Sequence, residues 1–228
     1  MSTAIIALTY KRVDQTRASW ANNLVSPYPV YWWDNTPPGA EREQLIEIAK
    51  NYNVVESFHD GSNYGIAHPI NRMAERIFAA GHDGFVTMAC DMLEPSEWIT
   101  ARETICNLLN AGIAAIPPYK LYCNVTRYAR KEINGIAYED DGDIIGNWYV
   151  AKWAYEMLGP YPEYYGIYGP IDLEYCARAR KKGVKYVYLS DMECECLPCD
   201  NDDTEYTLAK NVSLANAWPI YSNIISNL

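Results

Sequence analysis

The sequence predicts an α/β protein whose central sheet has mostly parallel strands. Short apolar stretches typical of strands alternate with longer stretches of helical periodicity through the first half of the chain. The chain has 228 residues, which is enough to bury one substantial core. It contains no internal repeat, long linker or low-complexity tract. We therefore expect a single domain over residues 1–228.

Four short apolar stretches of the first half are typical of buried strands. They are rich in Ile, Val, Trp and Phe, and turn-forming or polar residues follow each of them. We expect strands over residues 4–9, 29–34, 54–58 and 84–89.

The stretches next to these strands have helical periodicity. A first helix is expected to begin near Val13, and a second occupies residues 41–52. A third occupies residues 68–81 and ends at a glycine, as helices often do. A fourth occupies residues 96–112, with Ser96 as its N-cap and a glycine at its end.

The second half of the chain is less regular. Its abundant tyrosines, as in PYPEYYGIYG, are expected mainly to pack, although aromatic rings also line sugar sites. The expected elements are a strand with a proline break over 112–124, an irregular acidic region over 134–147, helices over 149–159 and 171–183, a strand over 185–191, and a helix from about Asp200 that packs back.

The charge balance restricts the partners. The chain carries 19 Lys and Arg against 29 Asp and Glu, a formal net charge of −10. A protein held on nucleic acid by phosphate contacts needs a basic face, so we expect no nucleic-acid partner. Charge alone would not hold this chain on an anionic membrane. A small anionic ligand stays compatible, because a local site can be positive or metal-bound in an acidic protein.

The N-terminus, MSTAIIALTYKR, lacks the pattern of a secretory signal. Signal peptides carry positive charge before a longer apolar stretch, whereas about six apolar residues precede the first basic one here. No run approaches the roughly 18 apolar residues of a membrane span. We therefore expect a soluble, cytoplasmic protein without a membrane span.

The chain has seven cysteines, three of them in the cluster CECLPC. A structural zinc site needs four ligands, usually as two separated pairs, and the sequence offers no evident second pair. Thiols of a cytosolic protein stay reduced. We predict that Cys194, Cys196 and Cys199 are ordinary loop residues, with zinc and a disulfide within the cluster as the alternatives.

Polar residues follow three of the predicted strands: residues 9–12, Asp34, and Asp91 after the strand that ends at residue 89. Ligands of parallel α/β sheets bind at these carboxyl ends. Burying an unpaired charge costs several kcal/mol, so a lone Asp after a core strand is at a surface edge, capped, or bound to a cation. We expect Asp91 on the rim of a ligand cleft.

Five segments, in this order, resemble the GT-A glycosyltransferases, in particular the family 2-like inverting enzymes. They are similar to the family's opening strand with its TYNR turn, a strand ending in Asp, an NxGxxxxxN spacing, the DxD strand with P-x-[DE]-W-[LI], and the ED-x-D-L-x-x-R-x-x-x-x-G helix with its following strand. Each motif alone is weak, and the order is what makes them specific. The segments are AIIALTYKR, VYWWDNTPPG, NYGIAHPIN, VTMACDMLEPSEWI and IDLEYCARARKKGVKYVYLSD.

The resemblance implies a GT-A fold with a nucleotide-sugar-binding half over residues 1–112 and an acceptor-binding half over 113–228. It implies transfer of a sugar from a nucleotide-diphosphate sugar, UDP-linked by the family's pattern, to an acceptor hydroxyl. A divalent cation, Mn²⁺ or Mg²⁺, would neutralise the diphosphate, since carboxylate oxygens suit these ions. The same cation would stabilise the leaving diphosphate.

The resemblance also implies donor-binding residues. Asp91 matches the last Asp of DxD and is the implied metal ligand. Thr9, Tyr10 and Asp34 are placed around the base and ribose, although Asp34 could equally be a turn or helix cap and Asn63 could be a left-handed turn residue. The implied donor-binding set is Thr9, Tyr10, Arg12, Asp34, Asn63, Gly65, Ala89, Cys90 and Asp91.

The chain departs from the family's pattern at three places. Ala89 replaces the first Asp of DxD, and Ile171 replaces the Glu of the ED pair. The histidine that often completes the metal site is absent, and Glu193, Glu195 or Cys196 occupies that neighbourhood. Metal binding is therefore expected to be weak or to depend on bound nucleotide.

Inverting transfer needs a base that takes the proton of the acceptor hydroxyl. Asp172 matches the retained Asp of the ED pair and opens a predicted helix after GIYGP. An Asp in that place is also typical of an N-terminal cap. Glu174 is the second candidate for the base.

The sequence lacks the motifs of other enzyme classes that share this alternation of strands and helices. A dinucleotide-binding oxidoreductase needs GxGxxG after its first strand, and TYKRVDQ contains no glycine. A sugar nucleotidyltransferase should have a Gly-rich basic loop at the same place. The altered DxD leaves a degenerate, non-catalytic nucleotide-sugar or carbohydrate-binding protein as the alternative to a glycosyltransferase.

Overall fold

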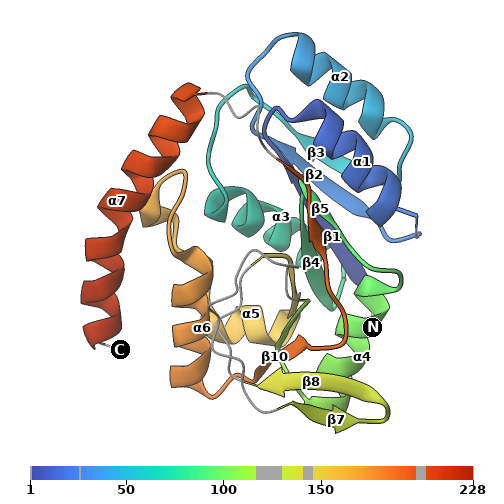
Figure 1. Ribbon diagram of the computed structural model, residues 1–228, viewed down its shortest axis with the longest axis vertical. Coiled ribbons are helices and arrows are strands. Elements are labelled where there is room, and N and C mark those ends of the chain that lie inside the picture. The colour runs from blue at the N-terminus through green and yellow to red at the C-terminus, as the bar shows by residue number, and fades with distance from the viewer. Residues whose placement is uncertain (1, 26, 117–129, 141–145, 199–203, 228) are drawn as a thin grey trace.

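The computed structural model describes residues 2–25, 27–116, 130–140, 146–198 and 204–227. Within these ranges nine strands form one sheet, and two short strands form a second (Figure 1). The strands of the large sheet are β1 (Thr3–Thr9), β2 (Val30–Asp34), β3 (Val54–Phe58), β4 (Gly84–Ala89), β6 (Ile113–Ala115), β7 (Lys131–Ile133), β8 (Ile136–Asp140), β9 (Trp148–Ala151) and β10 (Tyr186–Leu189). Strands β5 (Met92–Leu93) and β11 (Glu195–Cys196) pair antiparallel.

The large sheet has the order β3-β2-β1-β4-β9-β6-β10-β8-β7. Pairing is parallel throughout β3-β2-β1-β4 and again between β6 and β10. Strand β9 is antiparallel to both β4 and β6, and β8 is antiparallel to β10 and β7. Only β8 and β9 of the described strands therefore oppose the common direction, which confirms the predicted α/β fold with a mostly parallel sheet.

Helices cover both faces of the sheet (Figure 1). The right-handed crossovers β1-α1-β2 and β2-α2-β3 lead toward the β3 edge, and β3-α3-β4 leads back, so α3 lies on the opposite face from α1 and α2. The described helices are α1 (Val13–Asn23), α2 (Ala40–Ala49), α3 (Ala67–Ala79), α4 (Trp98–Leu109), α5 (Lys152–Leu158), the 3₁₀ turn η1 (Glu163–Tyr165), α6 (Ile171–Lys182) and α7 (Thr204–Asn227).

The core lies along the central strands and is unusually aromatic in the second half. Four consecutive residues of β1, Ala4 to Ala7, have no exposed surface. The rings of Tyr161 and Tyr175 stack with centroids 4.0 Å apart, and Trp148 stacks on Tyr161 at 5.4 Å. These rings are buried, and so is Tyr165, so Tyr161 and Tyr165 of the PYPEYYGIYG segment pack in the core, as the sequence predicted.

Two predictions for the second half were wrong. The region 134–147, expected to be irregular, contains strand β8. The stretch 149–159, expected to be one helix, begins within strand β9 and becomes helical only at Lys152. The residues of β9 are fully buried between β4 and β6, and a short buried run does not reveal its period, so strand and helix are indistinguishable there from sequence.

The ends of α4 also differ from expectation. Ser96 is not the N-cap: Glu97 takes that position, with φ +59° and no side-chain hydrogen bond. At the other end Asn110 adopts the left-handed conformation that closes the helix. The first part of the predicted strand with a proline break over 112–124 is realised as β6, and its residues 117–124 lie outside the described residues.

The C-terminal helix α7 confirms the expected helical tail that packs back. Figure 1 shows it alongside η1 and α6, which it contacts. Across the part of the chain that the structure describes, every helix is too short or too polar to cross a membrane.

Candidate functional site

The expected site lies at the carboxyl edge of β1, β2 and β4. Parallel pairing places Thr9 opposite Asp34 and Leu8 opposite Ala89. The residues that follow these strands therefore meet at one edge, because β1 lies between β2 and β4. Asp91 follows β4 directly and is partly exposed, with 27% of its side-chain surface accessible.

The turn after β1 is conformationally strained. Lys11 and Arg12 both adopt the left-handed region, with φ of 52° and 49°. This region costs an L-residue about 1–2 kcal/mol, and such strain concentrates at functional sites. The Lys11 amide donates to Thr36 Oγ1 at 2.7 Å, which fixes the turn against the end of β2. The strain therefore sets the direction in which the Arg12 side chain leaves the edge.

Arg12 forms an ion pair with Asp91. Its guanidinium donates to Asp91 Oδ2, and 18% of the arginine side-chain surface is exposed. Two residues expected in the donor site are thus brought together from chain positions far apart. The pair answers why a lone Asp follows a core strand: a positive side chain compensates its charge.

Asp34 is fully buried, and its two carboxylate oxygens have different surroundings. Oδ1 accepts from the Thr9 hydroxyl at 2.8 Å and from the Thr36 amide at 3.0 Å. Oδ2 has no hydrogen-bond partner among the described residues. Asp34 forms a turn with Thr36 and does not cap α2, whose N-cap is Gly39. A buried acceptor without a donor is costly, so this oxygen suits a ligand N–H or O–H.

His59 lies close enough to Asp34 to interact with it electrostatically. Its ring stands 5.6 Å from the Trp32 ring, and its Nδ1 is also buried without a partner among the described residues. Burial and the neighbouring Arg42 guanidinium lower the pKa of His59 despite the opposing effect of Asp34. The lowered pKa favours the neutral imidazole at pH 7. No motif in the sequence indicated that His59 would lie here.

Thr9 holds Asp34 in place. Its hydroxyl donates to Asp34 and accepts from Trp32 Nε1 at 2.9 Å. Thr9 is 2% exposed, and both bonds stay within the protein. Of the two neighbours, Asp34 therefore carries the oxygen that a ligand would contact.

Cys90 lies buried between Ala89 and Asp91. Burial, reinforced by the Asp91 carboxylate, raises the pKa of its thiol to about 12. A thiol that stays protonated is neither a nucleophile nor a good metal ligand. Among the three residues at the DxD position, Asp91 alone offers a charged oxygen.

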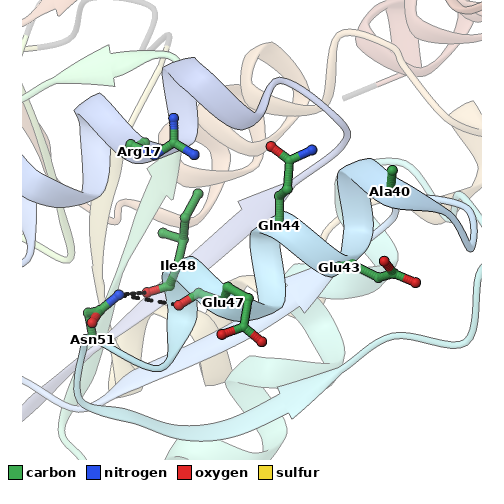
Figure 2. A pocket seen from close by; sticks show the side chains of 7 residues that line it. All are labelled: Arg17, Ala40, Glu43, Gln44, Glu47, Ile48 and Asn51. Carbon is green, nitrogen blue, oxygen red and sulfur yellow. Dashed lines mark hydrogen bonds between the residues drawn. The ribbon is translucent and has the colours of Figure 1, made fainter.

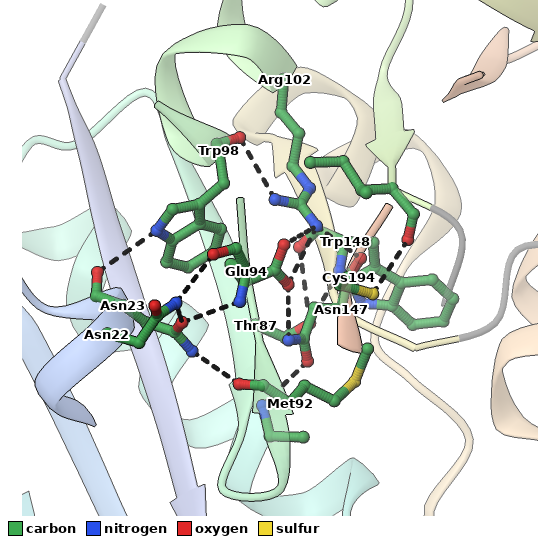
Figure 3. Close-up of polar contacts among 12 residues, drawn as sticks. Asn22, Asn23, Thr87, Met92, Glu94, Trp98, Arg102, Asn147, Trp148 and Cys194 are labelled. Carbon is green, nitrogen blue, oxygen red and sulfur yellow. Dashed lines mark hydrogen bonds and ion pairs between the residues drawn. The ribbon is translucent and has the colours of Figure 1, made fainter. Parts of the chain in front are cut away.

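A buried polar network holds the turn that carries Asp91 (Figure 3). Arg102 donates to both Glu94 oxygens, at 3.0 and 3.1 Å, and neither side chain is exposed. Asn147 donates to Glu94 Oε1 at 2.7 Å and accepts from the Ala89 amide at 2.8 Å. The network therefore fixes the backbone two residues before Asp91. Sequence reasoning missed these residues, because they come from three separate segments.

The loop before α3 is clipped to the end of β2 by Asn35. Its side chain donates to Gly65 O at 2.8 Å and accepts from the Tyr64 amide at 3.1 Å. Asn63 accepts from the Gly65 amide at 2.9 Å, which is a side-chain turn and not the left-handed backbone considered from the sequence. Asn63 and Gly65 thus belong to a loop that lies at the expected edge.

Gly65 is required by a close backbone approach. It has φ +72°, and a Cβ added there would lie 2.5 Å from Ile167 Cα. The loop that leads into α6 therefore packs directly on the loop at Asn63. This contact places the chain five residues before Asp172 beside the loop at Asn63.

The two candidate bases on α6 differ sharply. Glu174 is 2% exposed and is saturated by the Tyr164 and Tyr165 hydroxyls and by the Arg178 guanidinium. Asp172 lies in the first turn and is partly exposed, and its Oδ1 accepts from the Leu173 amide at 2.9 Å. The N-cap position belongs to Pro170, so Asp172 is not the N-cap considered from the sequence.

An aromatic contact links the edge to the C-terminal helix. The Tyr10 ring packs on the Tyr206 ring with centroids 4.5 Å apart and planes tilted by 34°. Tyr206 lies in the first turn of α7, more than 190 residues away along the chain. No local pattern in the sequence could have shown that α7 covers part of this edge.

The cysteine cluster lies beside Asp91. Strand β11 pairs with β5, with Cys196 opposite Met92, and the Leu197 amide donates to Asp91 O at 2.7 Å. Cys194 is buried, and its Sγ donates to Ile116 O at 3.7 Å. Both are free thiols, and Cys199 lies outside the described residues. The prediction that the cluster holds no zinc stays a prediction.

The residues around Asp91 do not form a metal site that is complete by itself. In the described ranges no three His, Cys, Asp or Glu side chains are grouped to hold a metal ion, and Arg12 already occupies Asp91. Mg²⁺ usually binds through one or two carboxylates together with substrate phosphates. Asp91 fits that second arrangement, in which the ligand brings most of the donor oxygens.

A shallow hollow of about 760 Å³ lies elsewhere, between α1 and α2 (Figure 2). It is lined mainly by exposed polar side chains, such as Glu43 and Glu47. Strand-end residues do not reach it. The carboxyl edge, where buried polar groups converge, is therefore the candidate site, and this hollow is not.

The fold is similar to that of solved glycosyltransferase structures. TarS of S. aureus matches with a TM-score of 0.60 and 14% identity, over 87% of this chain and 37% of that one. TarS 1–349 in complex with UDP-GlcNAc gives 0.61 and 14%, over 89% and 60%. GalNAc-T7 with UDP, GalNAc and Mn²⁺ gives 0.66 and 11%, over 86% and 43%.

This likeness shows the fold. No protein-family model matches the sequence, and no curated protein sequence matches it. The chain spans less than two thirds of the length of each of these solved chains. The predicted GT-A-like fold is confirmed.

Proposed function

We propose that this chain is a glycosyltransferase that moves a sugar from a UDP-linked donor to an acceptor hydroxyl. The observation that carries the proposal is the likeness in fold, over most of this chain, to structures that hold UDP-GlcNAc or UDP, GalNAc and Mn²⁺. The carboxyl edge of β1, β2 and β4 supports it, since buried polar groups and a strained turn meet there.

In this proposal residues 1–112 bind the donor. Asp34 Oδ2 accepts a hydrogen bond from the base or ribose, and Thr9 keeps the carboxylate oriented. Tyr10 offers a ring on which the base stacks, and the loop at Asn63 and Gly65 closes the same edge. Because Asp34 is fully buried, donor binding must open the residues above it.

The diphosphate is proposed to lie near Arg12 and Asp91. A guanidinium forms paired hydrogen bonds with phosphate oxygens. A divalent cation, Mn²⁺ or Mg²⁺, would be held by Asp91 together with the diphosphate and would neutralise the leaving group. The protein supplies the orientation of Asp91, through the network of Glu94, Arg102 and Asn147.

Residues 113–228 are proposed to bind the acceptor. Asp172 is the proposed general base, since it is partly exposed at the start of α6, whereas Glu174 is buried and saturated. Asp172 would take the proton of the acceptor hydroxyl as that oxygen attacks the anomeric carbon from the face opposite the diphosphate. A well-placed base contributes about 10²–10⁴-fold in rate.

A thermal-shift screen of nucleotide sugars, with and without Mn²⁺, tests donor binding. A ligand at about 100 times its Kd stabilises the folded state by about 2.7 kcal/mol. For a chain of this size that corresponds to about 5–11 °C in Tm. Asp91→Asn should lose the Mn²⁺-dependent part of the shift and keep the Tm of the free protein. If none of the nucleotide sugars raises the Tm, the proposal is refuted.

Asp172→Asn tests the chemistry. The amide is nearly isosteric and still accepts the Leu173 hydrogen bond, so folding and donor binding should persist. Transfer should fall by at least about a hundredfold if Asp172 is the base. Normal turnover in Asp172→Asn would show that Asp172 is not the general base. Donor binding by the wild type without any transfer would instead support the degenerate binding protein, which the replacement of the first DxD Asp by Ala89 favours.

A further inference from the structure

The Arg12–Asp91 ion pair raises a question about the order of binding. Arg12 occupies one oxygen of the carboxylate that the proposed function gives to a metal. Both side chains are partly exposed, at 18% and 27%, so a ligand can reach the pair without opening the core. The strained backbone at residues 11 and 12 holds the arginine on this side of the edge.

A bare cation gains little at such a carboxylate. The guanidinium cancels the negative charge that would attract the ion, and a displaced arginine would stay nearby as a like charge. Across the described ranges no cluster of His, Cys, Asp or Glu offers replacement ligands. As far as the described residues go, Asp91 paired with Arg12 is therefore a poor site for Mn²⁺ or Mg²⁺ in the free protein.

A diphosphate changes this balance. It brings negative oxygens that suit the planar guanidinium, and it can carry a bound metal ion. Arg12 can then leave Asp91 for a phosphate while Asp91 binds the metal. One ion pair and one metal–diphosphate complex become two new contacts, with no change in total charge and no proton transfer.

We infer that Arg12 is a resident counter-ion that keeps divalent metal off Asp91 until a nucleoside diphosphate draws the arginine away. The inference rests on the proposed function, because that function places the diphosphate here. It makes metal binding conditional on the nucleotide and gives Arg12 a role separate from base recognition.

Mn²⁺ binding to the free protein, followed by the electron paramagnetic resonance signal of unbound Mn²⁺, tests the inference without any turnover. The variants are Arg12→Gln, Arg12→Lys and the double variant Arg12→Gln/Asp91→Asn. Arg17→Gln is the matched control, because Arg17 lies on α1 and forms an exposed pair with Asp14 at 2.9 Å. Thermal melting confirms that each variant is folded, and Arg12→Met replaces Arg12→Gln if the latter is not.

Wild type, Arg12→Lys and Arg17→Gln should bind Mn²⁺ weakly and alike. Arg12→Gln should bind it at least about tenfold more tightly, since the competing charge is gone. The double variant should lose this gain, because Asp91 is its source. Equal Mn²⁺ affinity in wild type and Arg12→Gln would overturn the inference, and so would tight Mn²⁺ binding by the free wild type.

A second titration in the presence of UDP separates this inference from the proposed function. Wild type with UDP should bind Mn²⁺ far more tightly than wild type alone. Suppose that neither wild type nor any variant binds UDP, but Arg12→Gln still binds Mn²⁺ more tightly than wild type. The proposed function then fails, and the inference that Arg12 keeps metal off Asp91 stands. If UDP and Mn²⁺ bind together but Arg12→Gln behaves as wild type without UDP, the function survives and the inference fails.

Discussion

Replacing Glu94 by Gln should destabilise the fold strongly, although the two side chains have nearly the same shape. Glu94 and Arg102 are both fully buried, and the guanidinium contacts both carboxylate oxygens at 3.0–3.1 Å. The substitution leaves the arginine charge buried without a negative partner. Breaking a buried pair in this way costs about 3–5 kcal/mol.

The loss has further structural reasons. Asn147 donates to Glu94 Oε1 at 2.7 Å, and a Gln at position 94 can present an oxygen to Asn147 or to Arg102 but not fully to both. Arg102 also lies over the Trp98 ring at 5.1 Å, so its position depends on several neighbours at once. For a chain of this size 3–5 kcal/mol corresponds to a fall of about 6–20 °C in Tm.

Urea denaturation followed by circular dichroism measures the effect. Asp14→Asn, in the exposed pair with Arg17, is the matched control and should cost less than about 1 kcal/mol. The double substitution Glu94→Leu/Arg102→Met should cost less than Glu94→Gln, because it removes both charges. If Glu94→Gln lowers the free energy of unfolding by less than about 1 kcal/mol, the argument that the substitution leaves an uncompensated buried Arg102 charge is refuted.

Three further predictions concern the same edge and its surroundings. Lys11→Asn should raise the free energy of unfolding by up to about 1 kcal/mol in urea denaturation, because Asn tolerates the left-handed conformation better than Lys; a destabilised variant would show that the lysine side chain compensates the strain. Burial raises the pKa of Glu163, but hydrogen bonds from Asn71 and His68 outweigh it, so the pKa lies below its usual value. A lowered carboxyl pKa stabilises the fold above the unfolded pKa and loses that contribution as the pH falls, so the Tm values of wild type and Glu163→Gln should converge from about pH 6 to about pH 3; parallel curves would contradict this. Tyr206→Ala should tighten UDP binding by up to about tenfold in calorimetry, because a stack worth about 0.5–1.5 kcal/mol no longer competes for the Tyr10 ring; weaker binding would mean that Tyr206 belongs to the base site.

The first half of the fold was predictable because each signal there is local. Predicted strands at 4–9, 29–34, 54–58 and 84–89 agree with β1 to β4 to within one residue at each end. Each is a short apolar run bounded by Gly, Pro or polar residues. The hydrophobic pattern of each strand and its ends can therefore both be recognised from residues close together in the sequence. Strand β9 was not predictable in this way, because its partners β4 and β6 are far along the chain.

The sequence indicated which residues follow the central strands, but it did not indicate the contacts that these residues make. A carboxylate after a core strand signalled a charged edge, and Asp91 is at that edge. That Arg12 would compensate it depends on the left-handed turn at residues 11 and 12, which L-residues other than Asn and Asp rarely adopt. Asn147, which holds the Ala89 amide, lies 58 residues away and has no motif of its own.

The net charge of −10 explains why positive side chains in the strained turn after β1 matter for binding an anion. An acidic protein repels a diphosphate at long range, so affinity for one requires positive charge within a few ångströms of the phosphates. In the proposed function, Lys11 and Arg12 supply that charge at the carboxyl edge of the sheet. The left-handed turn accompanies the contact of Arg12 with Asp91, and we expect that an ordinary helix start would not direct the guanidinium there. Shortening this turn or moving either charge by one position should therefore abolish diphosphate binding while leaving β1 and α1 intact.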